Sequence, residues 1–419
     1  MTPAARLQAA IDILDALGRT EQPLDRLLRD WFRTRRYAGS KDRAAIGERV
    51  FLVQRHRASL GWRMRSDAPR ALVIASLLKE NVAPGPLFAG GGYGPAELSH
   101  EECAAIAAAP PGEPPLHARG EFPAFLEAEL ARAFASDVLA ELVALQSRAP
   151  VDLRINTLRR ERDEVLAALQ ARDFRAEPTP YSPLGVRIPS GEGMGELGRG
   201  AMFESGAFEF QDEAAQIAAL LCAAKPGERI LDLAAGAGGK SLALAAQMKN
   251  KGEIVACDIR QTALQQLAAR ATRAGASIIR THLVENELPD GPFNAVLVDA
   301  PCSGSGTWRR QPELRWRLTP ELLKARVAAQ DSLLEQAATR VRKGGRLIYA
   351  TCSILPCENE DRIAMFLAHH PDFAIRPSAD VWRESIQVEV PDFCERFFRA
   401  SPRTTGTDGF FTAVMERTR

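Results

Sequence analysis

The sequence predicts an α/β protein of 419 residues built from three successive parts. Residues 1–145 carry apolar side chains at three- and four-residue spacing, which is typical of amphipathic helices. Residues 150–205 mix strand and helix patterns. Residues 206–419 alternate apolar runs with helical segments, which predicts a mostly parallel sheet covered by helices on both faces. At roughly 100–200 residues per domain, the length fits such a division.

Helical patterning in the N-terminal part falls into separate segments. Three stretches carry apolar side chains on one face: RLQAAIDILDALG, PLDRLLRDWFRTRR and DRAAIGERVFLVQRHRASLGW, at residues 6–18, 23–36 and 42–62. Asp42 is expected to cap the third helix, and Gly18 stands where the first should end. A loop rich in Gly and Pro is predicted at residues 82–99, and helical patterning returns at residues 122–146.

The composition indicates a globular protein of the cytoplasm. Hydrophobic residues make up 46% of the chain and charged residues 26%, which are ordinary globular values. The sequence contains no run of roughly 18 apolar residues for a membrane helix, and its N-terminus lacks the pattern of a signal peptide. Its seven cysteines are an odd number without a CxxC pair, which predicts free thiols and no metal site.

The second and third parts contain the predicted strands. VDLRINTL (151–158) predicts a strand, RERDEVLAALQAR (160–172) a helix and AMFESGAFEF (201–210) extended chain. The final DGFFTAVME (408–416) predicts a β arm at an edge of the sheet. The apolar runs that alternate with helical segments are RILDLA (229–234), EIVACD (253–258), SIIRTHL (277–283), FNAVLVDAP (293–301) and RLIYATCS (346–353).

A glycine-rich turn, DLAAGAGGKS, follows the first run of the parallel sheet. Gly236 and Gly238 let the backbone turn sharply at the carboxyl end of a strand, where open α/β sheets bind ligands. The next strand ends at Asp258, an acid placed to accept hydrogen bonds from ribose hydroxyls. The turn lacks the first glycine of a Walker loop, and it lacks the third glycine of GxGxxG, at Ser241. S-adenosylmethionine is therefore favoured over NAD as the ligand.

Two cysteines follow the fourth and fifth of these strands. Cys302 lies in DAPCSGSG and Cys352 in ATCS, each directly after an apolar strand and before a polar turn. Neighbouring parallel strands end at the same edge of a sheet, so both thiols are expected at the edge that holds the glycine-rich turn. The other interpretation, a small buried hydrophobe, is typical of a single cysteine in a strand.

Thiols at this place suit the methylation of a pyrimidine ring. C5 of cytosine or uracil is too electron-poor to attack a methyl sulfonium, whereas addition of a thiolate to C6 produces carbanion character at C5. After methyl transfer the C5 proton must leave and the thiol must be expelled, which requires a base. Asp299 is placed to donate or share a proton at N3 of cytosine while charge builds there.

At these residues the chain resembles the Sun/Fmu (RsmB-type) family of RNA cytosine-5 methyltransferases, and the likeness covers nearly the whole sequence. DLAAGAGGKS resembles the cofactor loop of that family, DAPCSGSGTWRRQPELRW its motif IV and YATCSILPCENED its motif VI. GAFEFQDEAAQ resembles the segment that leads into the catalytic domain, and VDLRINTL resembles the start of its small α/β subdomain. The helical start is similar to the NusB-like RNA-binding domain of the RsmB branch.

The resemblance implies a Rossmann-like fold of class I S-adenosylmethionine-dependent methyltransferases, with a mostly parallel seven-stranded sheet. It implies a monomeric enzyme that methylates C5 of a cytosine in RNA through a covalent bond between a cysteine and C6. The expected substrate is small-subunit (16S) ribosomal RNA of the cytosine-967 class, with transfer RNA as the alternative.

The resemblance also implies roles for single residues. Cys352 is the nucleophile, Cys302 assists release of the methylated product, and Asp299 contacts the cytosine. Lys240 approaches the cofactor or the target base. The implied cofactor-binding set is Asp232, Ala234, Ala235, Gly236, Ala237, Gly238, Lys240, Asp258 and Asp299.

Two positions depart from the family pattern. The family places an acid after the third strand to contact the adenine amino group, whereas this chain reads HLVENEL, where Glu285 or Asn286 is the substitute. Pro commonly precedes the two glycines of the loop, and here Ala237 stands there. The adenine contact therefore stays open, and no role is assigned to Cys357.

Two basic regions are candidates for contact with RNA, although the formal net charge is only +1. Residues 1–70 contain 15 Lys and Arg against 8 Asp and Glu, and residues 305–346 contain 10 against 4. Arginines interleaved with Trp308 and Trp316 are able to pair with phosphates and stack on bases. The alternative interpretation has equal weight: in it, the tryptophans pack in the core and the arginines are solvated. The RNA-binding candidates are Arg35, Arg36, Lys41, Arg43, Lys240, Arg309, Arg310, Arg315 and Arg317.

Two other functions fit parts of the pattern. A DNA cytosine-5 methyltransferase would use Cys302 as its nucleophile, but Cys352 would then be idle, and the chain shows no inserted DNA-recognition region. A non-catalytic RNA-binding factor would rely on the helical part alone. The intact cofactor acids and both thiols argue against that second function.

Overall fold

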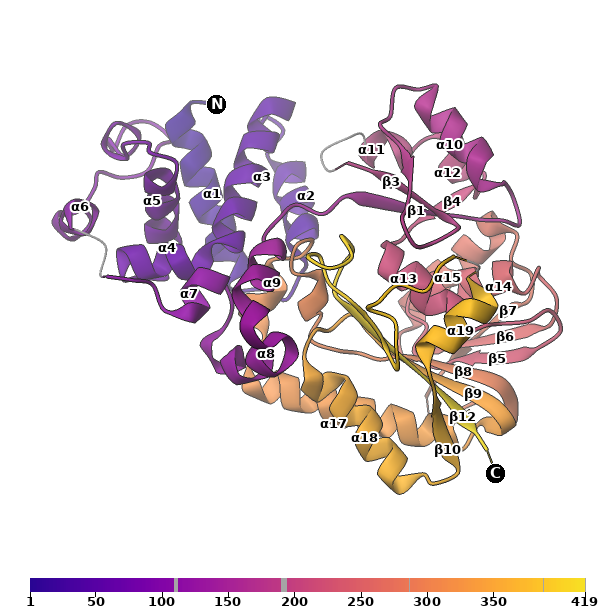
Figure 1. The fold of residues 1–419 in the computed structure, drawn as a ribbon. Helices are drawn as coiled ribbons and strands as arrows, with labels where there is room; N and C mark the ends of the chain where they lie inside the picture. The colour runs from indigo at the N-terminus through magenta and orange to yellow at the C-terminus, as the bar shows by residue number, and fades with distance from the viewer. Residues whose placement is uncertain (109–111, 190–193, 286, 387, 419) are drawn as a thin grey trace. The chain divides into compact units, whose positions relative to one another are not determined.

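The computed structural model describes residues 1–108, 112–189, 194–285, 287–386 and 388–418, and the chain forms two compact units (Figure 1). The helical unit consists of Met1–Ser147 and Trp308–Thr319, and the α/β unit consists of Arg148–Thr307 and Pro320–Arg419. Residues 308–319 thus fold with helices from the beginning of the chain. The predicted three-part division did not anticipate this insertion.

The helical unit is built from α-helices, and those within its first 88 residues share an apolar core. Thr2 caps the first helix by accepting a hydrogen bond from the amide of Ala5 at 3.2 Å, and Gly18 follows its last turn. The third predicted helix is in fact two, because the backbone leaves the helical conformation at His56. The helices are α1 (Pro3–Leu17), α2 (Leu24–Thr34), α3 (Ser40–Arg55), α4 (Arg57–Met64), α5 (Pro69–Lys79), α6 (His100–Ala107), α7 (Leu116–Gly120), α8 (Glu127–Phe134), α9 (Val138–Ala144) and α16 (Glu313–Arg317).

Asp42 stabilises the start of α3 as the third residue of that helix, whereas the N-cap is Gly39 and not Asp42 as predicted. Its carboxylate accepts a hydrogen bond from the amide of Gly39 at 3.2 Å, which satisfies a donor that precedes the first turn. The same carboxylate accepts from the ammonium group of Met1 at 3.2 Å and from Nε of Arg6 at 2.8 Å. Asp42 therefore also ties the beginning of α1 to α3.

A small antiparallel sheet covered by α10 begins the α/β unit. Its strand order is β2-β3-β1-β4, and Leu153 of β1 is in register with Val186 of β3 and Phe210 of β4. Residues 201–210, predicted as extended chain, contain a helical turn before the strand. The elements are β1 (Val151–Ile155), α10 (Arg162–Gln170), β2 (Glu177–Pro178), β3 (Gly185–Ile188), α11 (Met194–Leu197), α12 (Ala201–Glu204) and β4 (Phe208–Phe210).

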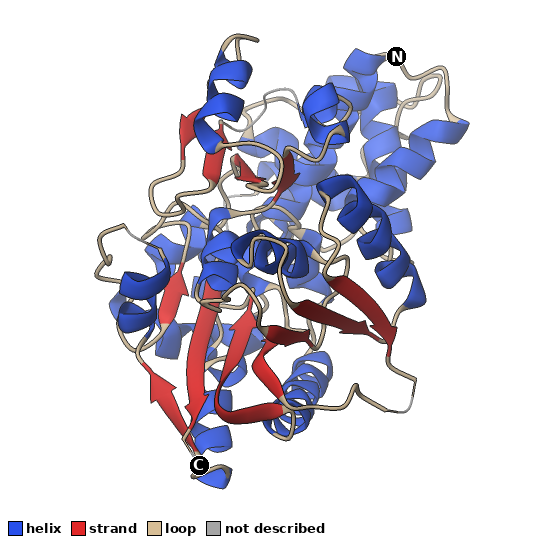
Figure 2. Cartoon of the chain, turned by 90° about the vertical axis from the view of Figure 1, so that its right-hand side faces the viewer, coloured by secondary structure: helices blue, strands red, loops and turns tan. Residues whose placement is uncertain are grey.

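The larger sheet has the order β10-β12-β9-β8-β5-β6-β7 (Figure 1), with β11 paired to β12. Figure 2 draws the strands in red among the blue helices. The pairs β9–β8, β8–β5, β5–β6 and β6–β7 are parallel, which confirms the predicted Rossmann-like class. The strands are β5 (Arg229–Asp232), β6 (Glu253–Asp258), β7 (Ile279–Leu283), β8 (Phe293–Asp299), β9 (Val341–Thr351), β10 (Phe373–Arg376), β11 (Phe398–Ala400) and β12 (Phe410–Arg417).

The C-terminal strand lies inside the sheet, so the prediction of a β arm at an edge was wrong. β12 runs antiparallel to both of its neighbours, β9 and β10. Phe411 and Val414 of this strand are both buried, in cores on opposite faces of the sheet. A strand that is apolar on both faces is stabilised by an interior position.

Helices cover both faces of the larger sheet, as predicted. One core joins α13, α14, α15 and α19 to sheet residues such as Ile230 and Ile348, and the other joins α17 and α18 to Val298 and Tyr349. In the described ranges no helix has the length and apolar character to cross a membrane. These helices are α13 (Glu213–Leu220), α14 (Gly239–Gln247), α15 (Gln261–Ala274), α17 (Pro320–Ala338), α18 (Glu360–His369) and α19 (Ser378–Ser385).

Candidate active site

The two thiols that the sequence places after β8 and β9 lie next to each other. β8 and β9 are parallel neighbours, with Asp299 in register with Ala350. The Sγ atoms of Cys302 and Cys352 are 3.4 Å apart. The amide of Gly306 donates a hydrogen bond to the carbonyl oxygen of Cys352 at 3.0 Å, which joins the two loops beside the thiols. Both cysteines are free and partly exposed.

A buried lysine supplies a positive charge to this pair. Lys240, in the first turn of α14, is 8% exposed, and its Nζ lies 2.7 Å from Oδ2 of Asp299. Burial lowers the pKa of Lys240, but the charge and hydrogen bond of Asp299 and the charge of Cys352 outweigh it, so the pKa is raised. Lys240 therefore stays cationic at neutral pH, and it also lies over the ring of Phe410 at 5.0 Å.

The two thiols differ in their electrostatic surroundings. The hydrogen bond with Cys352, burial, and the charges of Cys352 and Glu358 raise the pKa of Cys302 well above its usual range. Cys302 is therefore held in its protonated form. Cys352, unlike Cys302, lies close enough to the cation of Lys240 to interact with it electrostatically.

The glycine-rich turn between β5 and α14 needs glycine at two positions. Gly236 and Gly238 have φ values of +55° and +81°, in the left-handed region that side chains rarely adopt. A Cβ atom on Gly238 would lie 1.9 Å from Cδ1 of Leu267 in α15. The turn therefore packs closely on α15 and presents backbone rather than side chains at the carboxyl end of β5.

Asp258, at the end of β6, shapes the same turn. Its Oδ2 accepts a hydrogen bond from the amide of Gly236 at 2.9 Å, and its carboxylate also pairs with the side chain of Arg260 at 3.0 Å. Burial raises the pKa of Asp258, but the bonds from Arg260 and Gly236 outweigh it and lower the pKa. Asp258 is thus an ionised acceptor beside the turn, where a ribose hydroxyl donor would fit.

A second acid, Asp232, lies beneath the turn with an unused acceptor. Its Oδ2 accepts a hydrogen bond from Oγ of Ser241 at 2.5 Å, whereas its buried Oδ1 has no hydrogen-bond partner. Burial raises the pKa of Asp232 to about 7. The turn leaves its backbone open, and two acids with one unpaired oxygen lie beside it. This arrangement fits a polar nucleoside cofactor that carries an amino group. Ala234 and Ala235 complete the turn, and the amide of Ala235 donates to the carbonyl oxygen of Cys257 at 2.8 Å.

Two arginines that the sequence did not single out hold the backbone of the turn. Nη1 of Arg154 in β1 donates to the carbonyl oxygen of Gly239, and Nη1 of Arg270 in α15 donates to that of Ala237 at 2.6 Å. Glu209 in β4 accepts from Arg270 at 3.0 Å. Arg154 stands within VDLRINTL, but no spacing rule links a strand arginine to a turn more than 80 residues away.

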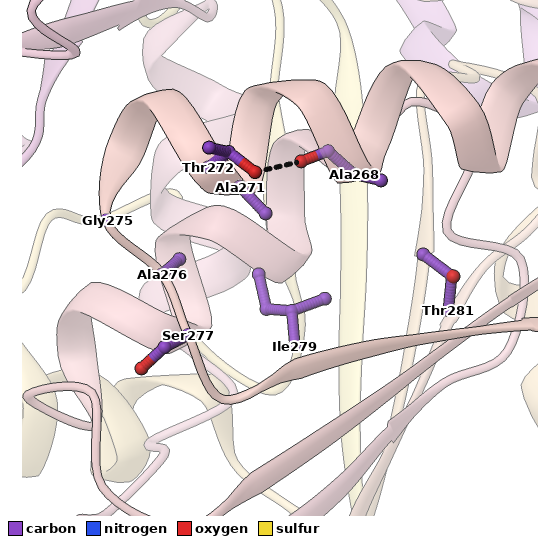
Figure 3. A pocket seen from close by; sticks show the side chains of 8 residues that line it. All are labelled: Ala268, Ala271, Thr272, Gly275, Ala276, Ser277, Ile279 and Thr281. Atoms are coloured by element: carbon purple, nitrogen blue, oxygen red, sulfur yellow. Dashed lines mark hydrogen bonds between the residues drawn. The ribbon is translucent and has the colours of Figure 1, made fainter.

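The hollow drawn in Figure 3 lies elsewhere, at the β7 edge between α15 and the sheet. Its lining side chains are small, apolar or hydroxyl-bearing, as at Ala268, Thr272 and Ile279. The hydroxyl of Thr272 is bonded to the carbonyl oxygen of Ala268 at 3.0 Å. This hollow contains none of the predicted site residues.

Comparison with known proteins points to one family. The sequence model of the family "16S rRNA methyltransferase RsmB/F" matches residues 219–416, and that of the ferredoxin-like domain of RsmF/B-like methyltransferases matches residues 122–192. The probable ribosomal RNA small subunit methyltransferase B of Bacillus subtilis is 30% identical over 306 residues, which cover 70% of this chain and 66% of that protein. Ribosomal RNA small subunit methyltransferase F of Serratia proteamaculans is 32% identical over 305 residues, covering 70% of this chain and 63% of that protein.

The chain belongs to the RsmB/F methyltransferase family. The crystal structure of PH0851 shares the fold, with a TM-score of 0.77 at 24% identity over 99% of both chains. The family resemblance expected from the motifs is thereby confirmed. The aligned stretches span about two thirds of the length of the two curated relatives.

The adenine contact of this family member is not identified by its structure. Glu285 is exposed, and Asn286 lies outside the described residues. The amide of Val284 donates to the carbonyl oxygen of Asp258 at 3.1 Å, which places this segment beside the end of β6. Ala237, where the family commonly has Pro, contributes its carbonyl oxygen to the bond with Arg270.

The basic segment after motif IV is packed into the helical unit, contrary to the expectation that its arginines contact phosphates. Trp308 is fully buried, and Arg315 is 1% exposed. The guanidinium group of Arg315 donates to the carbonyl oxygens of Glu121 and Leu145 at 2.9 and 3.4 Å. Arg309 is also buried, so the alternative in which these side chains pack in a core holds for this segment.

The remaining side chains of this segment are half-buried. Nε1 of Trp316 donates to the carbonyl oxygen of Gln54 at 2.7 Å, and Arg317 donates to the carbonyl oxygens of residues 20, 21 and 22. Arg310 is likewise half-buried. These contacts make the segment part of the framework of the helical unit.

The basic candidates near the start of α3 lie at the surface of the helical unit. Arg36 and Lys41 are exposed. Arg35 stacks on Trp31, with its Cζ 4.2 Å from the ring centroid, and Nε of Arg43 donates to the carbonyl oxygen of Ala38 at 2.8 Å. The structure thus leaves Arg36 and Lys41 available to a polyanion.

Proposed function

We propose that this chain transfers a methyl group from S-adenosylmethionine to C5 of a cytosine in small-subunit ribosomal RNA. One observation carries the proposal: two thiols lie 3.4 Å apart, beside the ion pair of the buried Lys240 with the partly exposed Asp299, at the edge of the sheet where the cofactor turn lies. The function that the curated relatives' names state supports the same class of substrate.

The residues around the turn are suited to hold the cofactor. Asp258 would accept hydrogen bonds from the ribose hydroxyls, and the unpaired Oδ1 of Asp232 would accept from the amino group, while Gly236 and Gly238 keep side chains out of the turn. When bound, S-adenosylmethionine supplies an electrophilic methyl group. Arg154 and Arg270 hold the turn in the shape that receives it.

The thiol of Cys352 begins the reaction on the base. Its sulfur, which lies beside the cation of Lys240, adds as a thiolate to C6 of cytosine. A proton that Asp299 shares with N3 offsets the negative charge that the addition places on the ring. C5 then takes the methyl group and loses its proton to a base. The C6–sulfur bond breaks last, and Cys302, held protonated, donates a proton to the departing sulfur.

The RNA must present an unpaired cytosine, because C6 is inaccessible inside a duplex. Arg36 and Lys41 on the helical unit are exposed and supply phosphate contacts, while Arg309 and Arg315 serve the packing of that unit instead. We assign the enzyme to the class that acts on cytosine 967 of 16S ribosomal RNA, as a monomer. Transfer RNA remains the alternative substrate.

Transfer of a labelled methyl group from S-adenosylmethionine tests this function. Purified protein is expected to label unmodified 16S ribosomal RNA but not transfer RNA or DNA, and bisulfite sequencing of RNA from a deletion strain should show one unmethylated cytosine. Label in DNA would indicate the DNA enzyme, and label in transfer RNA the alternative substrate. Calorimetry without any heat of S-adenosylmethionine binding would indicate a non-catalytic RNA-binding factor.

A further inference from the structure

We propose that Glu358 is a positioning residue of the two-thiol site, whose buried carboxylate fastens the loop of Cys302 to the loop of Cys352 for release of the methylated product. The proposal deepens the proposed function and rests on it. Glu358 lies six residues after Cys352, in the short 3-10 turn Pro356–Glu358, and its side chain is fully buried.

The carboxylate of Glu358 accepts hydrogen bonds from the neighbouring loop and from a helix. Oε1 accepts from the amide of Ser303 at 2.8 Å and from Nε2 of Gln330 in α17 at 3.1 Å. Oε2 accepts from Oγ of Ser303 at 2.5 Å. Ser303 directly follows Cys302, so Glu358 fixes the backbone immediately beside that thiol. Three donors to one carboxylate is the pattern of an ionised acceptor.

Three serine hydroxyls extend these bonds between the loops. Oγ of Ser305 lies 3.0 Å from Oγ of Ser303 and 3.0 Å from Oγ of Ser353, the residue after Cys352. Oγ of Ser305 also accepts from the amide of Ile354 at 3.0 Å. The residues that follow both thiols therefore belong to one buried hydrogen-bond network, in which each bond depends on the geometry of the others.

The network is anchored to the sheet and to α17. The hydroxyl of Tyr349 in β9 donates to the carbonyl oxygen of Glu358 at 2.6 Å. Nε2 of Gln330 also donates to the carbonyl oxygen of Pro301, at 3.0 Å, just before Cys302. The loops of both cysteines are thus attached to rigid elements, which is what a fixed contact between two thiols requires.

Burying a carboxylate costs free energy unless hydrogen bonds or nearby charges offset the loss of hydration. Glu358 acts electrostatically on Cys302 and on Tyr349, and the ion pair of Arg362 with Asp331, whose atoms lie 2.7 Å apart, also acts on Tyr349. Arg362 is committed to Asp331 and to the carbonyl oxygen of Cys357. The negative charge of Glu358 therefore acts on Cys302, where it favours the protonated thiol that product release uses.

The test compares Glu358→Gln with Glu360→Gln, a matched control. Glu360 lies two residues away, is paired with Arg399 at 2.6 Å and has no bond to the network in the described residues. Glu358→Gln keeps the size of the side chain but removes its charge. We expect the pH midpoint for alkylation of Cys302 by iodoacetamide, followed by peptide mass spectrometry, to fall by about one unit, with no change in Glu360→Gln.

A second measurement follows the covalent complex with RNA. Glu358→Gln is expected to form the denaturation-resistant complex within about threefold of the wild-type rate but to release it roughly tenfold more slowly, because only the second step uses Cys302 as an acid. Equal losses in formation and release would show a general structural role and overturn the proposal. So would an unchanged alkylation midpoint.

The alkylation measurement needs neither RNA nor cofactor, so it judges the positioning role separately from the proposed function. Failure of the wild-type protein to form any RNA complex would contradict the proposed function alone. If Glu358→Gln does not fold, Ser303→Ala replaces it. That variant keeps the amide bond of Ser303 to Oε1 and loses the hydroxyl bonds of Ser303 to Oε2, Ser305 and Ser353. Because this variant keeps the charge of Glu358, its alkylation midpoint should not fall. Release of the covalent complex should be slowed by less than in Glu358→Gln, and an unchanged release rate would overturn the proposal.

Discussion

The Sγ atoms of Cys302 and Cys352 lie 3.4 Å apart, although 50 residues separate the two cysteines along the chain. The contact exists because β8 and β9 are parallel neighbours whose carboxyl ends meet at one edge of the sheet. Lys240 and Asp299 lie beside one member of the pair and Glu358 beside the other. The two thiols thus have different electrostatic surroundings, which suits them to different steps of the proposed reaction.

Replacing each cysteine separately distinguishes their roles. Cys352→Ala is expected to lower methyl transfer by at least about 10³-fold and to abolish covalent complexes with RNA, because the nucleophile is lost. Cys302→Ala is expected to accumulate such complexes, because release is slowed. Gel electrophoresis under denaturing conditions with labelled RNA measures both. Cys103→Ala, at an exposed position of the helical unit, serves as the control. The reverse pattern, with trapping lost only in Cys302→Ala, would indicate a Cys302 nucleophile.

The buried acid Asp232 makes the stability of the α/β unit depend on pH. Its pKa is raised to about 7, so the folded protein binds a proton that the unfolded chain releases near pH 4. Stability therefore falls as the pH rises from about 4 to 7, by roughly 3–4 kcal/mol at most, and then levels off. Asp232→Asn should melt close to wild type at pH 4 and several degrees higher at pH 8, as measured by calorimetry.

Asp258 provides a control of opposite sign. Its pKa is lowered by Arg260 and Gly236, so its ionised form stabilises the fold above the unfolded pKa and the benefit is lost as the pH falls through the folded pKa. Asp258→Asn should therefore melt below wild type at pH 8. A melting temperature of Asp232→Asn that follows wild type at every pH would contradict the raised pKa of Asp232.

Arg154 is expected to affect cofactor affinity without touching the cofactor. Its guanidinium group bonds both Gln211 and the carbonyl oxygen of Gly239, and a lysine cannot hold both acceptors in the same geometry. Arg154→Lys should weaken S-adenosylmethionine binding about tenfold, which corresponds to about 1.4 kcal/mol. Isothermal titration calorimetry measures this change. Arg160→Lys, an exposed change in the same subdomain, should leave the affinity within twofold, and equal weakening in both variants would argue against a specific role of the turn contact.

Substitution of Arg315 should lower stability, whereas substitution of Arg36 should weaken RNA binding. Arg315→Met leaves the carbonyl oxygens of Glu121 and Leu145 without their buried donor, at a cost of roughly 2–4 kcal/mol in unfolding of the helical unit. Arg36→Ala, at an exposed position, should leave stability unchanged and weaken RNA binding at low salt. Urea unfolding and filter binding over a salt series measure the two effects. Loss of RNA affinity in folded Arg315→Met at unchanged stability would restore the phosphate-contact role for Arg315.

The order of elements around the candidate site could be predicted because the signals are local. An apolar run followed by Gly236 and Gly238 predicts a strand and a tight turn, and a cysteine directly after each of two further runs predicts thiols at one sheet edge. Parallel strands end at the same edge whatever fills the rest of the molecule. The position of the thiols therefore followed from the pattern.

Other features depended on partners far along the chain. Trp308 and Arg315 resemble a nucleic-acid surface in sequence, yet they are buried because Glu121 and Leu145, from distant helices, supply acceptors for the arginine. The final strand lies in the interior of the sheet because Phe411 and Val414, on its opposite faces, both pack in apolar cores.

The sequence by itself determined the α/β class, the glycine-rich turn and the two thiols, since each rests on periodicity or on residues that are close in the chain. Only the tertiary structure decided which charged side chains are buried and what they bind. The burial of Glu358 and the bond from Arg154 to Gly239 arise when segments many residues apart supply matching donors and acceptors. The periodicity of apolar side chains indicates that one face of a helix or strand is buried, but it does not indicate which segment packs against that face.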